Sequence, residues 1–345
     1  MRFEKNQLAE VRIEDIGSEG EGIGKVDGFP LFVKDTVVGD LVRVKLTKVK
    51  KNYAFARLEE ILEESADRIT PPCPKYRACG GCQIQQLSYG KQLEFKQKKV
   101  WNDLLRIGGF TERELSEVFL PILGMEEPWR YRNKAQYPVG RDKEGSVITG
   151  FYAGRTHSII ANTDCLLGAK ENEAVLMAVL NYVKESGCSI YNEETGKGLL
   201  RHVLIRKSRA TGEVMVCLIL NGRKLPGQEL LIREFQKIPE IVSISINVNT
   251  EQTNVILGKE TVCISGKPQI EDTLWLWDEE GQRTGEHVTY RISPNSFYQV
   301  NPVQTERLYS LALQYAGLTG TEIVWDLYCG IGTISLFLAG HAGKV

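Results

Sequence analysis

The chain has 345 residues, 42% hydrophobic and 25% charged, with a formal net charge of −1. This composition is that of an ordinary globular protein with room for two or three domains, and it excludes collagen-like and low-complexity chains. No apolar run is long enough to cross a membrane, and the opening residues, MRFEKNQLAEV, form no apolar signal segment. We therefore expect a cytoplasmic monomer without a membrane partner.

Residues 8–60 alternate short apolar runs with turns, and this pattern predicts a small OB-like barrel of about five strands. Asp27-Gly28 and Gly39-Asp40 are turn sequences typical of hairpins. Small barrels of this kind often bind oligonucleotides. The alternative is a barrel that serves only in assembly.

Two basic clusters interrupt this near-neutral chain. The first has no acidic residue between its members, which are Arg43, Lys45, Lys48, Lys50, Lys51 and Arg57. The second contains Arg130, Arg132, Lys134 and Arg141. Either cluster alone is compatible with a solvated face. Together with nearby aromatic residues they favour a polyanion partner, because cations bind phosphates and rings stack on bases.

Four cysteines have spacing typical of a metal site. Cys73, Cys79 and Cys82 read C-x5-C-x2-C across a Gly-Gly turn, and Cys165 follows far downstream. Thiolates are soft ligands that hold zinc or an iron-sulfur cluster, and the spacing does not separate the two. In a reducing compartment a disulfide framework is disfavoured, and the remaining alternative is a set of free thiols.

The middle of the chain mixes helical and strand patterns. A helix is predicted from Leu93 and should stop at Gly108-Gly109. Residues 128–285 predict an α+β domain with helices around 170–186 and 228–237. Its expected strands are SVITGFYAG, LLRHVLIRKS, EVMVCLIL, VSISINVN and TNVILG. The fold class is therefore a multidomain α/β chain.

The last sixty residues predict a nucleotide-type cofactor site. Asn301 and Pro302 should open a helix that Gly317 closes, and an apolar strand is expected over 323–327. The strand runs into a glycine turn that opens a helix, so the backbone can approach a ligand. Its candidate cofactor residues are Asp326, Tyr328, Gly330, Gly332 and Thr333. Ser335 replaces the third glycine of a dinucleotide fingerprint, which favours S-adenosyl-L-methionine.

The order of these motifs carries a resemblance. The barrel sequence is followed by CPKYRACGGCQIQQL, YRNKAQYPV, GFYAGRTHSIIANTDC, ISPNSFYQVNP and DLYCGIGTISL. This order resembles that of the RNA uracil-5-methyltransferases, and is most similar to that of the bacterial enzymes that methylate 23S ribosomal RNA. The resemblance covers essentially the whole chain.

The resemblance implies a domain plan. Residues 1–62 would be a TRAM barrel that binds RNA. Residues 63–90 with 125–285 would form the central domain, and residues 91–124 with 286–345 would begin a Rossmann-like methyltransferase domain.

The resemblance also implies roles for single residues. Gln299 would contact S-adenosylmethionine together with Tyr328. Cys73, Cys79, Cys82 and Cys165 would hold a 4Fe-4S cluster, with zinc as the alternative. The expected RNA contacts are Lys48, Lys50, Lys51, Arg130, Arg132 and Lys134.

The chemistry of the family requires a further residue. Carbon 5 of uracil is a weak nucleophile, so a cysteine thiolate adds to carbon 6 and a base later removes the carbon 5 proton. In the family both groups follow the cofactor loop, and the four remaining cysteines, Cys188, Cys217, Cys263 and Cys329, lie in no matching context. The resemblance therefore implies an inactive amino-terminal portion of a longer enzyme, with no catalytic residue before Val345.

Other functions stay open from the sequence. The chain fits a non-catalytic iron-sulfur protein that binds RNA, and motif chemistry does not separate ribosomal from transfer RNA. A radical S-adenosylmethionine enzyme is disfavoured, because its cluster loop has three residues between the first two cysteines, whereas this chain has five.

Overall fold

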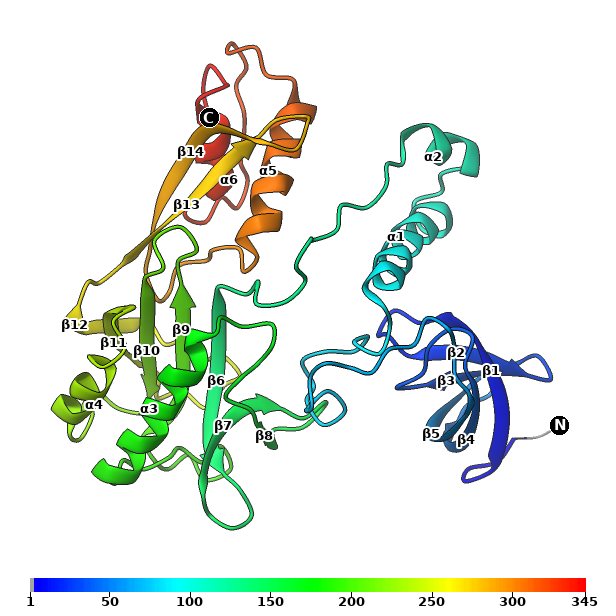
Figure 1. Ribbon diagram of the computed structural model, residues 1–345, viewed down its shortest axis with the longest axis horizontal. Helices are drawn as coiled ribbons and strands as arrows, with labels where there is room; N and C mark the ends of the chain where they lie inside the picture. The colour runs from blue at the N-terminus through cyan, green and yellow to red at the C-terminus, as the bar shows by residue number, and fades with distance from the viewer. Residues whose placement is uncertain (1–2) are drawn as a thin grey trace. The chain divides into compact units, whose positions relative to one another are not determined.

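The computed structural model describes residues 3–345 and divides into two compact units (Figure 1). The first unit comprises residues 1–126 and 153–156, and the second comprises residues 127–152 and 157–345. Each unit has its own hydrophobic core. The domain boundaries expected from the sequence stay a prediction. Within residues 3–345, no helix combines the length and the apolar character that a membrane span requires.

A closed barrel of five strands opens the first unit, as the sequence predicts, with the strand order β1-β2-β3-β5-β4. Its strands are β1 (Leu8–Ile16), β2 (Gly22–Val26), β3 (Phe29–Val33), β4 (Leu41–Val49) and β5 (Ala54–Glu63). Alternate side chains point inward, because successive residues of a strand face opposite sides. The fully buried interior includes Ile13, Leu31, Val33, Val42, Val44, Leu46 and Ala54.

The two expected hairpin turns differ in outcome. Asp27-Gly28 joins β2 to its neighbour β3, and both residues have positive φ, which is the hairpin geometry that this pair favours. The prediction for Gly39-Asp40 is wrong. This pair leads from β3 into β4, which are not neighbours in the barrel, because β5 lies between them.

Asp40 has a structural role instead. Its side chain is completely buried and forms an ion pair with Arg68. The same carboxylate accepts hydrogen bonds from the backbone N–H of Val37 at 2.7 Å and of Ser65 at 2.9 Å. These donors compensate the cost of removing the charged carboxylate from water. Asp40 thus joins the segment after β5 to the turn before β4.

Two helices complete the first unit. Helix α1 (Tyr89–Arg106) confirms the helix expected from Leu93, and α2 (Glu112–Val118) begins with a capping box between Thr111 and Glu114. The ammonium group of Lys98 on α1 lies 3.0 Å from the Asp15 carboxylate on β1. This pair is exposed and contributes little to stability.

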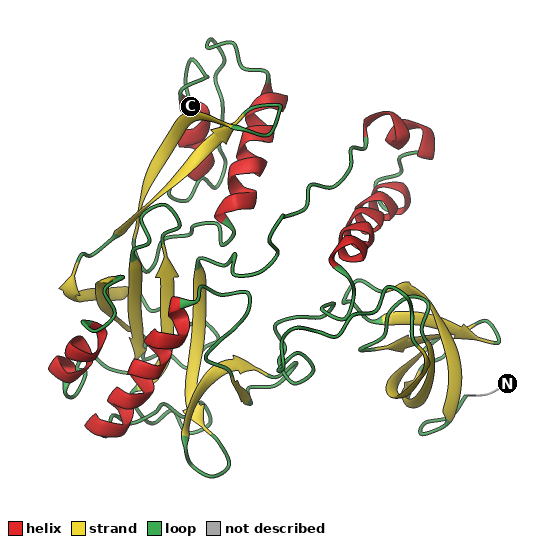
Figure 2. Ribbon diagram, in the orientation of Figure 1, coloured by secondary structure: helices red, strands yellow, loops and turns green. Residues whose placement is uncertain are grey.

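A seven-stranded sheet forms the centre of the second unit, with the order β12-β11-β10-β9-β6-β7-β8. Its strands are β6 (Lys134–Arg141), β7 (Val147–Tyr152), β8 (Ile159–Ala161), β9 (Leu200–Lys207), β10 (Val214–Leu220), β11 (Ile241–Val248) and β12 (Glu260–Gly266). Helices α3 (Glu171–Ser186) and α4 (Gln228–Phe235) pack on one face (Figure 2). Every side chain of β10 is buried, and Cys217 packs in the core among them.

The strand expected at TNVILG, residues 253–258, is wrong. This segment has no strand partner, and asparagine side chains bind its backbone instead. Asn249 donates to the carbonyls of Val255 at 2.7 Å and Ile256 at 2.9 Å, and Asn247 donates to that of Gly258 at 2.9 Å. Because these side chains satisfy the carbonyls, the segment can cover the sheet without pairing.

The carboxyl-terminal part of the second unit is a hairpin covered by helices. Strands β13 (Ile270–Trp277) and β14 (Arg283–Ile292) pair with each other, and α5 (Pro302–Ala316) and α6 (Thr333–Ala339) pack against them. Helix α5 has the predicted caps: the Asn301 side chain accepts from the backbone N–H of Gln304 at 3.2 Å, and Gly317 is left-handed.

The strand expected over 323–327 and the start of a doubly wound sheet do not form within residues 3–345. Only Ile323 makes a bridge, with Lys344, and the side chains of Trp325 and Leu327 are 82% and 73% exposed. A strand requires a neighbour to satisfy its backbone groups, and the described residues provide none beyond this bridge.

Replacing Asp40 with alanine should destabilise the barrel by about 3–5 kcal/mol, because Arg68 would keep a buried charge without its partner. Hydrogen exchange measured by mass spectrometry should show faster exchange in β4 and unchanged exchange in β10. Glu63→Ala is the matched control, since it breaks the exposed Arg12–Glu63 pair, which contributes about 0–1 kcal/mol. Equal exchange in the two variants would contradict the role assigned to Asp40.

Candidate nucleic-acid interface and cofactor loop

Three aromatic rings cluster on the outside of the barrel. Phe32 on β3 lies 5.5 Å from the ring centre of Tyr53 and 5.7 Å from that of Phe55, and the latter two are 5.6 Å apart. Phe55 is 37% exposed and Phe32 lines a surface cavity of about 350 Å3. Exposed rings held against one another form a platform on which bases can stack.

The basic residues beside this platform divide into two groups. Arg43 is bound by Glu10 at 2.9 Å and Glu60 at 2.6 Å, and Arg57 is bound by Glu59 at 2.7 Å. The three lysines expected to contact RNA behave differently. Their side chains are exposed, and across residues 3–345 none is paired with a carboxylate; they are Lys48, Lys50 and Lys51. These three lysines lie at the end of β4 and in the turn that leads to β5.

Arg130, the first member of the second cluster, is occupied by structural contacts. Its guanidinium donates to the Asp164 carboxylate at 2.5 Å and to the Cys165 carbonyl at 3.1 Å. The bond to Asp164 raises the pKa of Arg130. Its backbone has φ +54°, and its N–H donates to the Leu166 carbonyl at 2.8 Å. These contacts fix the segment that leads into β6.

Lys134 begins β6 in an electropositive and partly buried position. Burial, with the nearby charges of Arg206 and Arg132, lowers the pKa of Lys134 to about 8. Burial also lowers the pKa of Arg206 to about 10. Arg206 is only 2% exposed, and within the described part of the chain it makes no ion pair. Three cations without a carboxylate partner form a site suited to an anion.

The segment 293–300 is held beside this basic site. Arg206 donates to the carbonyls of Pro294, at 3.3 Å, and Ser296. Asn133 donates from its side chain to the Gln299 carbonyl, at 2.9 Å, and from its backbone to the Val300 carbonyl, also at 2.9 Å. Gln299, the expected cofactor contact, is therefore next to the residue that precedes Lys134. The sequence analysis missed Asn133 and Arg206, because residues that bind only backbone carbonyls form no motif.

The expected cofactor loop, residues 326–333, has the conformation that glycine turns allow. Gly330 and Gly332 have positive φ, and Tyr328 does too, with its side chain fully exposed. The Asp326 carboxylate accepts a hydrogen bond from Ser335. Thr333 begins α6, where its carbonyl accepts from Tyr290 at 2.8 Å and its hydroxyl lies 3.0 Å from that of Tyr309. The loop is thus fixed at its end and presents Tyr328 to solvent.

The four cysteines expected to hold a cluster are all partly buried. Cys73, Cys79 and Cys82 belong to the first unit and Cys165 to the second. The Cys79 thiol accepts from the Gly81 N–H at 3.4 Å. Among residues 3–345, no three His, Cys, Asp or Glu side chains are grouped so that they could hold a metal ion. The expected 4Fe-4S cluster and its zinc alternative therefore gain no support.

Comparison with known proteins identifies the barrel and the relatives of the chain. Residues 2–58 match the family model of the TRAM domain. The chain is 46% identical over 342 residues to an uncharacterized RNA methyltransferase of Halalkalibacterium halodurans, covering 99% of this chain and 71% of the relative. It is 46% identical to one of Clostridium acetobutylicum with the same coverages.

A solved structure resembles the whole fold. It is described as the tRNA (uracil-54, C5)-methyltransferase of Pyrococcus abyssi in complex with S-adenosyl-L-homocysteine. The TM-score is 0.69 at 25% sequence identity, and the match covers 96% of this chain and 70% of that one.

These matches bear on the expectation of an inactive, truncated portion. Relatives named RNA methyltransferases align with 99% of the chain, and the chain spans 71% of their length. The comparison gives no support to the predicted loss of activity.

RNA binding should depend on pH through Lys134. The side chain is protonated below about pH 8 and neutral above it, so a phosphate contact is present at pH 7 and is lost as the pH rises. We expect the Kd for RNA to increase by up to about tenfold per pH unit above 8. Lys134→Arg, which stays charged, should remove this dependence in fluorescence anisotropy titrations. A wild-type Kd that stays constant from pH 7 to 9.5 would exclude the contact.

Proposed function

Because the chain belongs to the RNA methyltransferases, we propose that it acts in the methylation of uridine at carbon 5, with S-adenosylmethionine as the methyl donor. The observation that carries the proposal is the attachment of segment 293–300 to the basic end of β6 and β9. Asn133 and Arg206 hold Gln299 beside Lys134, so a residue suited to the cofactor and a cation suited to an RNA phosphate share one site.

The reaction needs an activated uracil. Addition of a thiolate to carbon 6 creates an enolate, and its carbon 5 takes the methyl group from the sulfonium of S-adenosylmethionine. A base then removes the proton from carbon 5, and elimination breaks the carbon–sulfur bond and releases the thiolate. The target base must leave its stack to be reached. Gln299 and Tyr328 would hold the methyl donor, and Asp326 and Thr333 would support the loop around it.

The nucleophile is assigned to none of the cysteines that the family motifs leave unexplained. Burial raises the pKa of Cys188 and raises that of Cys217 to about 12. Both thiols are therefore protonated at neutral pH and are poor nucleophiles. Cys263 donates to the carbonyls of Ser265 and Gly266 at 3.5 and 3.7 Å, a local contact within a strand end.

The RNA partner would be bound by the barrel as well as by the second unit. The ring platform of Phe32, Tyr53 and Phe55 suits unstacked bases, and the unpaired lysines beside it suit phosphates. Ribosomal RNA is the substrate that the motif resemblance favours. Transfer RNA is the alternative, because the similar Pyrococcus abyssi structure is that of a tRNA methyltransferase.

The activity can be tested with RNA that carries tritium at carbon 5 of uridine. Because no cysteine of this chain is assigned as the nucleophile, the assay uses the protein that contains this chain. Its incubation with S-adenosylmethionine should release tritium to water and produce 5-methyluridine, detected by mass spectrometry of the digested RNA. Parallel reactions with 23S ribosomal RNA and transfer RNA transcripts identify the substrate. Methylation at another atom, without tritium release, would contradict the proposal.

Cofactor binding gives a test that does not depend on turnover. Gln299→Ala should weaken S-adenosylmethionine binding about tenfold in calorimetry, since a lost hydrogen bond to a charged group contributes about 1.5–3 kcal/mol. Gln282→Ala is the control, because Gln282 is an exposed glutamine on the neighbouring hairpin. The same Kd in both variants would remove Gln299 from the cofactor site.

Simultaneous replacement of Lys48, Lys50 and Lys51 by alanine should weaken the binding of RNA whatever its nucleotide sequence. Each lost phosphate contact should reduce the slope of log Kd against log salt by about 1, so a decrease of about 2–3 is expected. The matched control replaces three exposed lysines of the second unit, Lys143, Lys184 and Lys224. An unchanged slope in the barrel variant would show that these lysines do not contact RNA.

A further inference from the structure

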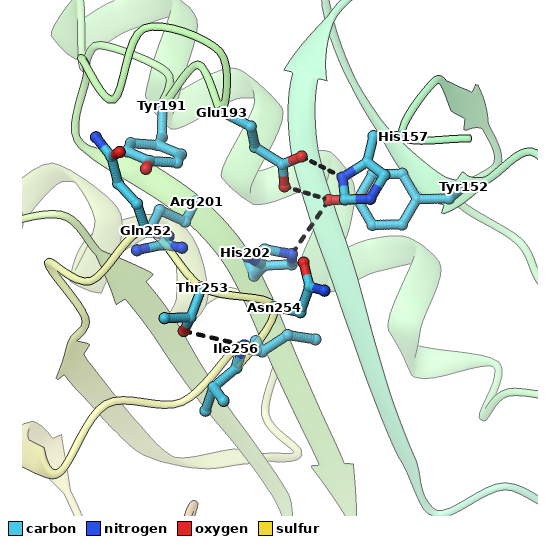
Figure 3. A pocket seen from close by; sticks show the side chains of 11 residues that line it. Tyr152, His157, Tyr191, Glu193, Arg201, His202, Gln252, Thr253, Asn254 and Ile256 are labelled. Carbon is cyan, nitrogen blue, oxygen red and sulfur yellow. Dashed lines mark hydrogen bonds and ion pairs between the residues drawn. The ribbon is translucent and has the colours of Figure 1, made fainter. Parts of the chain in front are cut away.

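A second cavity, which lies in the second unit, includes no residue of the cofactor loop in its lining (Figure 3). Its volume is about 490 Å3, within the range of small-ligand sites. It is formed at the beginning of β9, by the end of β7 and by the segment 252–256 that covers the sheet. Its lining includes Tyr152, Tyr191, Glu193, Arg201, His202 and Asn254.

One wall of the cavity is acidic and held in place. The Glu193 carboxylate accepts a hydrogen bond from the Tyr152 hydroxyl at 3.0 Å and pairs with the His157 ring, as Figure 3 shows. Burial alone would raise the pKa of Glu193, but the bonds from His157 and Tyr152 outweigh it and lower the pKa overall. The Glu193 carboxylate is therefore ionised and held in position, and it can accept hydrogen bonds from the N–H groups of a ligand.

The inner part of the cavity contains buried polar atoms with unused capacity. His202 is 6% exposed, and burial together with Arg201 lowers its pKa to about 4, so the ring is neutral at pH 7. Its Nδ1 atom has no hydrogen-bond partner among residues 3–345, and neither has Nε of Arg201. Buried polar atoms without partners are rare, and these two belong to side chains that line the cavity.

The same region offers a flat surface. The Arg201 guanidinium lies 4.4 Å from the centre of the Tyr191 ring, and its Nη1 donates to the carbonyls of Asn249 and Glu251 at 2.7 and 2.8 Å. These contacts use part of the charge of Arg201. Because the Glu193 carboxylate lines the same cavity and repels anions, and His202 is neutral, the cavity is poorly suited to a phosphate, although Arg201 makes no ion pair among residues 3–345. A neutral heterocycle with hydrogen-bonding edges fits better.

We propose that this cavity receives one unstacked base of single-stranded RNA, distinct from the uridine that is methylated. The inference rests on the proposed function, since it takes RNA to be the ligand. Because a carboxylate only accepts hydrogen bonds, Glu193 selects the bases with an exocyclic amino group, which are adenine, cytosine and guanine, over uracil, which has none.

The position of the cavity fits a role in holding RNA beside the target. His202 and Arg206 both lie on β9, an even number of residues apart, so their side chains point to the same side of the sheet. They are four residues apart, which corresponds to roughly 13 Å along a strand. A base in the cavity would therefore lie a few nucleotides from a phosphate at Lys134 and Arg206, and would fix the register of the RNA.

The test measures binding of fluorescent ten-nucleotide RNAs made of only A, only C or only U to the full chain. Wild type should bind the A and C oligomers more tightly than the U oligomer. Glu193→Gln should lose about tenfold in affinity for A and C and little for U. Glu194→Gln is the matched control, because Glu194 is its exposed neighbour and does not line the cavity.

Asn254→Ala provides a second variant, since this exposed residue of the segment 252–256 faces the cavity and its loss should not affect folding. It should also weaken A and C binding. Equal affinities of wild type, Glu193→Gln and Asn254→Ala for all three oligomers would overturn the inference.

Free AMP and CMP distinguish the source of the base. If either binds as tightly as the A or C oligomer and depends on Glu193, the occupant is a mononucleotide and the RNA proposal is wrong. The methylation assay separates the two proposals. If uridine is methylated but Glu193→Gln does not change oligomer binding, only this inference is wrong. If binding of the A and C oligomers depends on Glu193 but no uridine is methylated, only the proposed function is wrong.

Discussion

The complete burial of β10 is the constraint on which the second unit depends. Its side chains are apolar on both faces of the sheet, so both faces must be covered. Helices α3 and α4 cover one face, where Val214, Val216 and Leu218 join the core. On the other face Met215 packs against the β13–β14 hairpin, and Cys217 packs near the segment 252–258. The elements that carry the cofactor loop and the second cavity are thus the ones that complete this core.

The neighbouring strand β9 uses two buried arginines to position these covering segments. Arg206 holds segment 293–300 and Arg201 holds residues 249–251, in each case through backbone carbonyls and, across residues 3–345, without an ion pair. Carbonyl dipoles compensate a buried cation only in part, which is why burial lowers the pKa of Arg206. Burial of these arginines therefore lowers the stability of the fold, but their hydrogen bonds fix two loops next to polar side chains.

The sequence predicted what depends on local chemistry and missed what depends on distant partners. The barrel, the Asp27-Gly28 turn and the caps of α5 follow from residue preferences within a few positions. Gly39-Asp40 failed as a hairpin because Asp40 binds Arg68, far along the chain. TNVILG failed as a strand because asparagine side chains from β11 and its end take its carbonyls. The role of Arg206 is likewise decided by a segment that follows it by about ninety residues, and no local pattern marks it.

The environment of Lys134 indicates what the basic site is built for. Its pKa in the folded chain, about 8, lies below the value of 10.5 for a solvated lysine, so between these values the unfolded chain binds more protons and stability rises with pH. Below pH 8 the folded chain therefore carries the full cost of a partly buried cation near Arg132 and Arg206. A lysine selected only for packing could be replaced by a neutral side chain without that cost. A bound phosphate would offset it, because an anion restores the favourable field that burial and the two arginines remove. An anionic ligand at this site, such as the RNA phosphate proposed above, would therefore lower the free-energy cost of the buried charge.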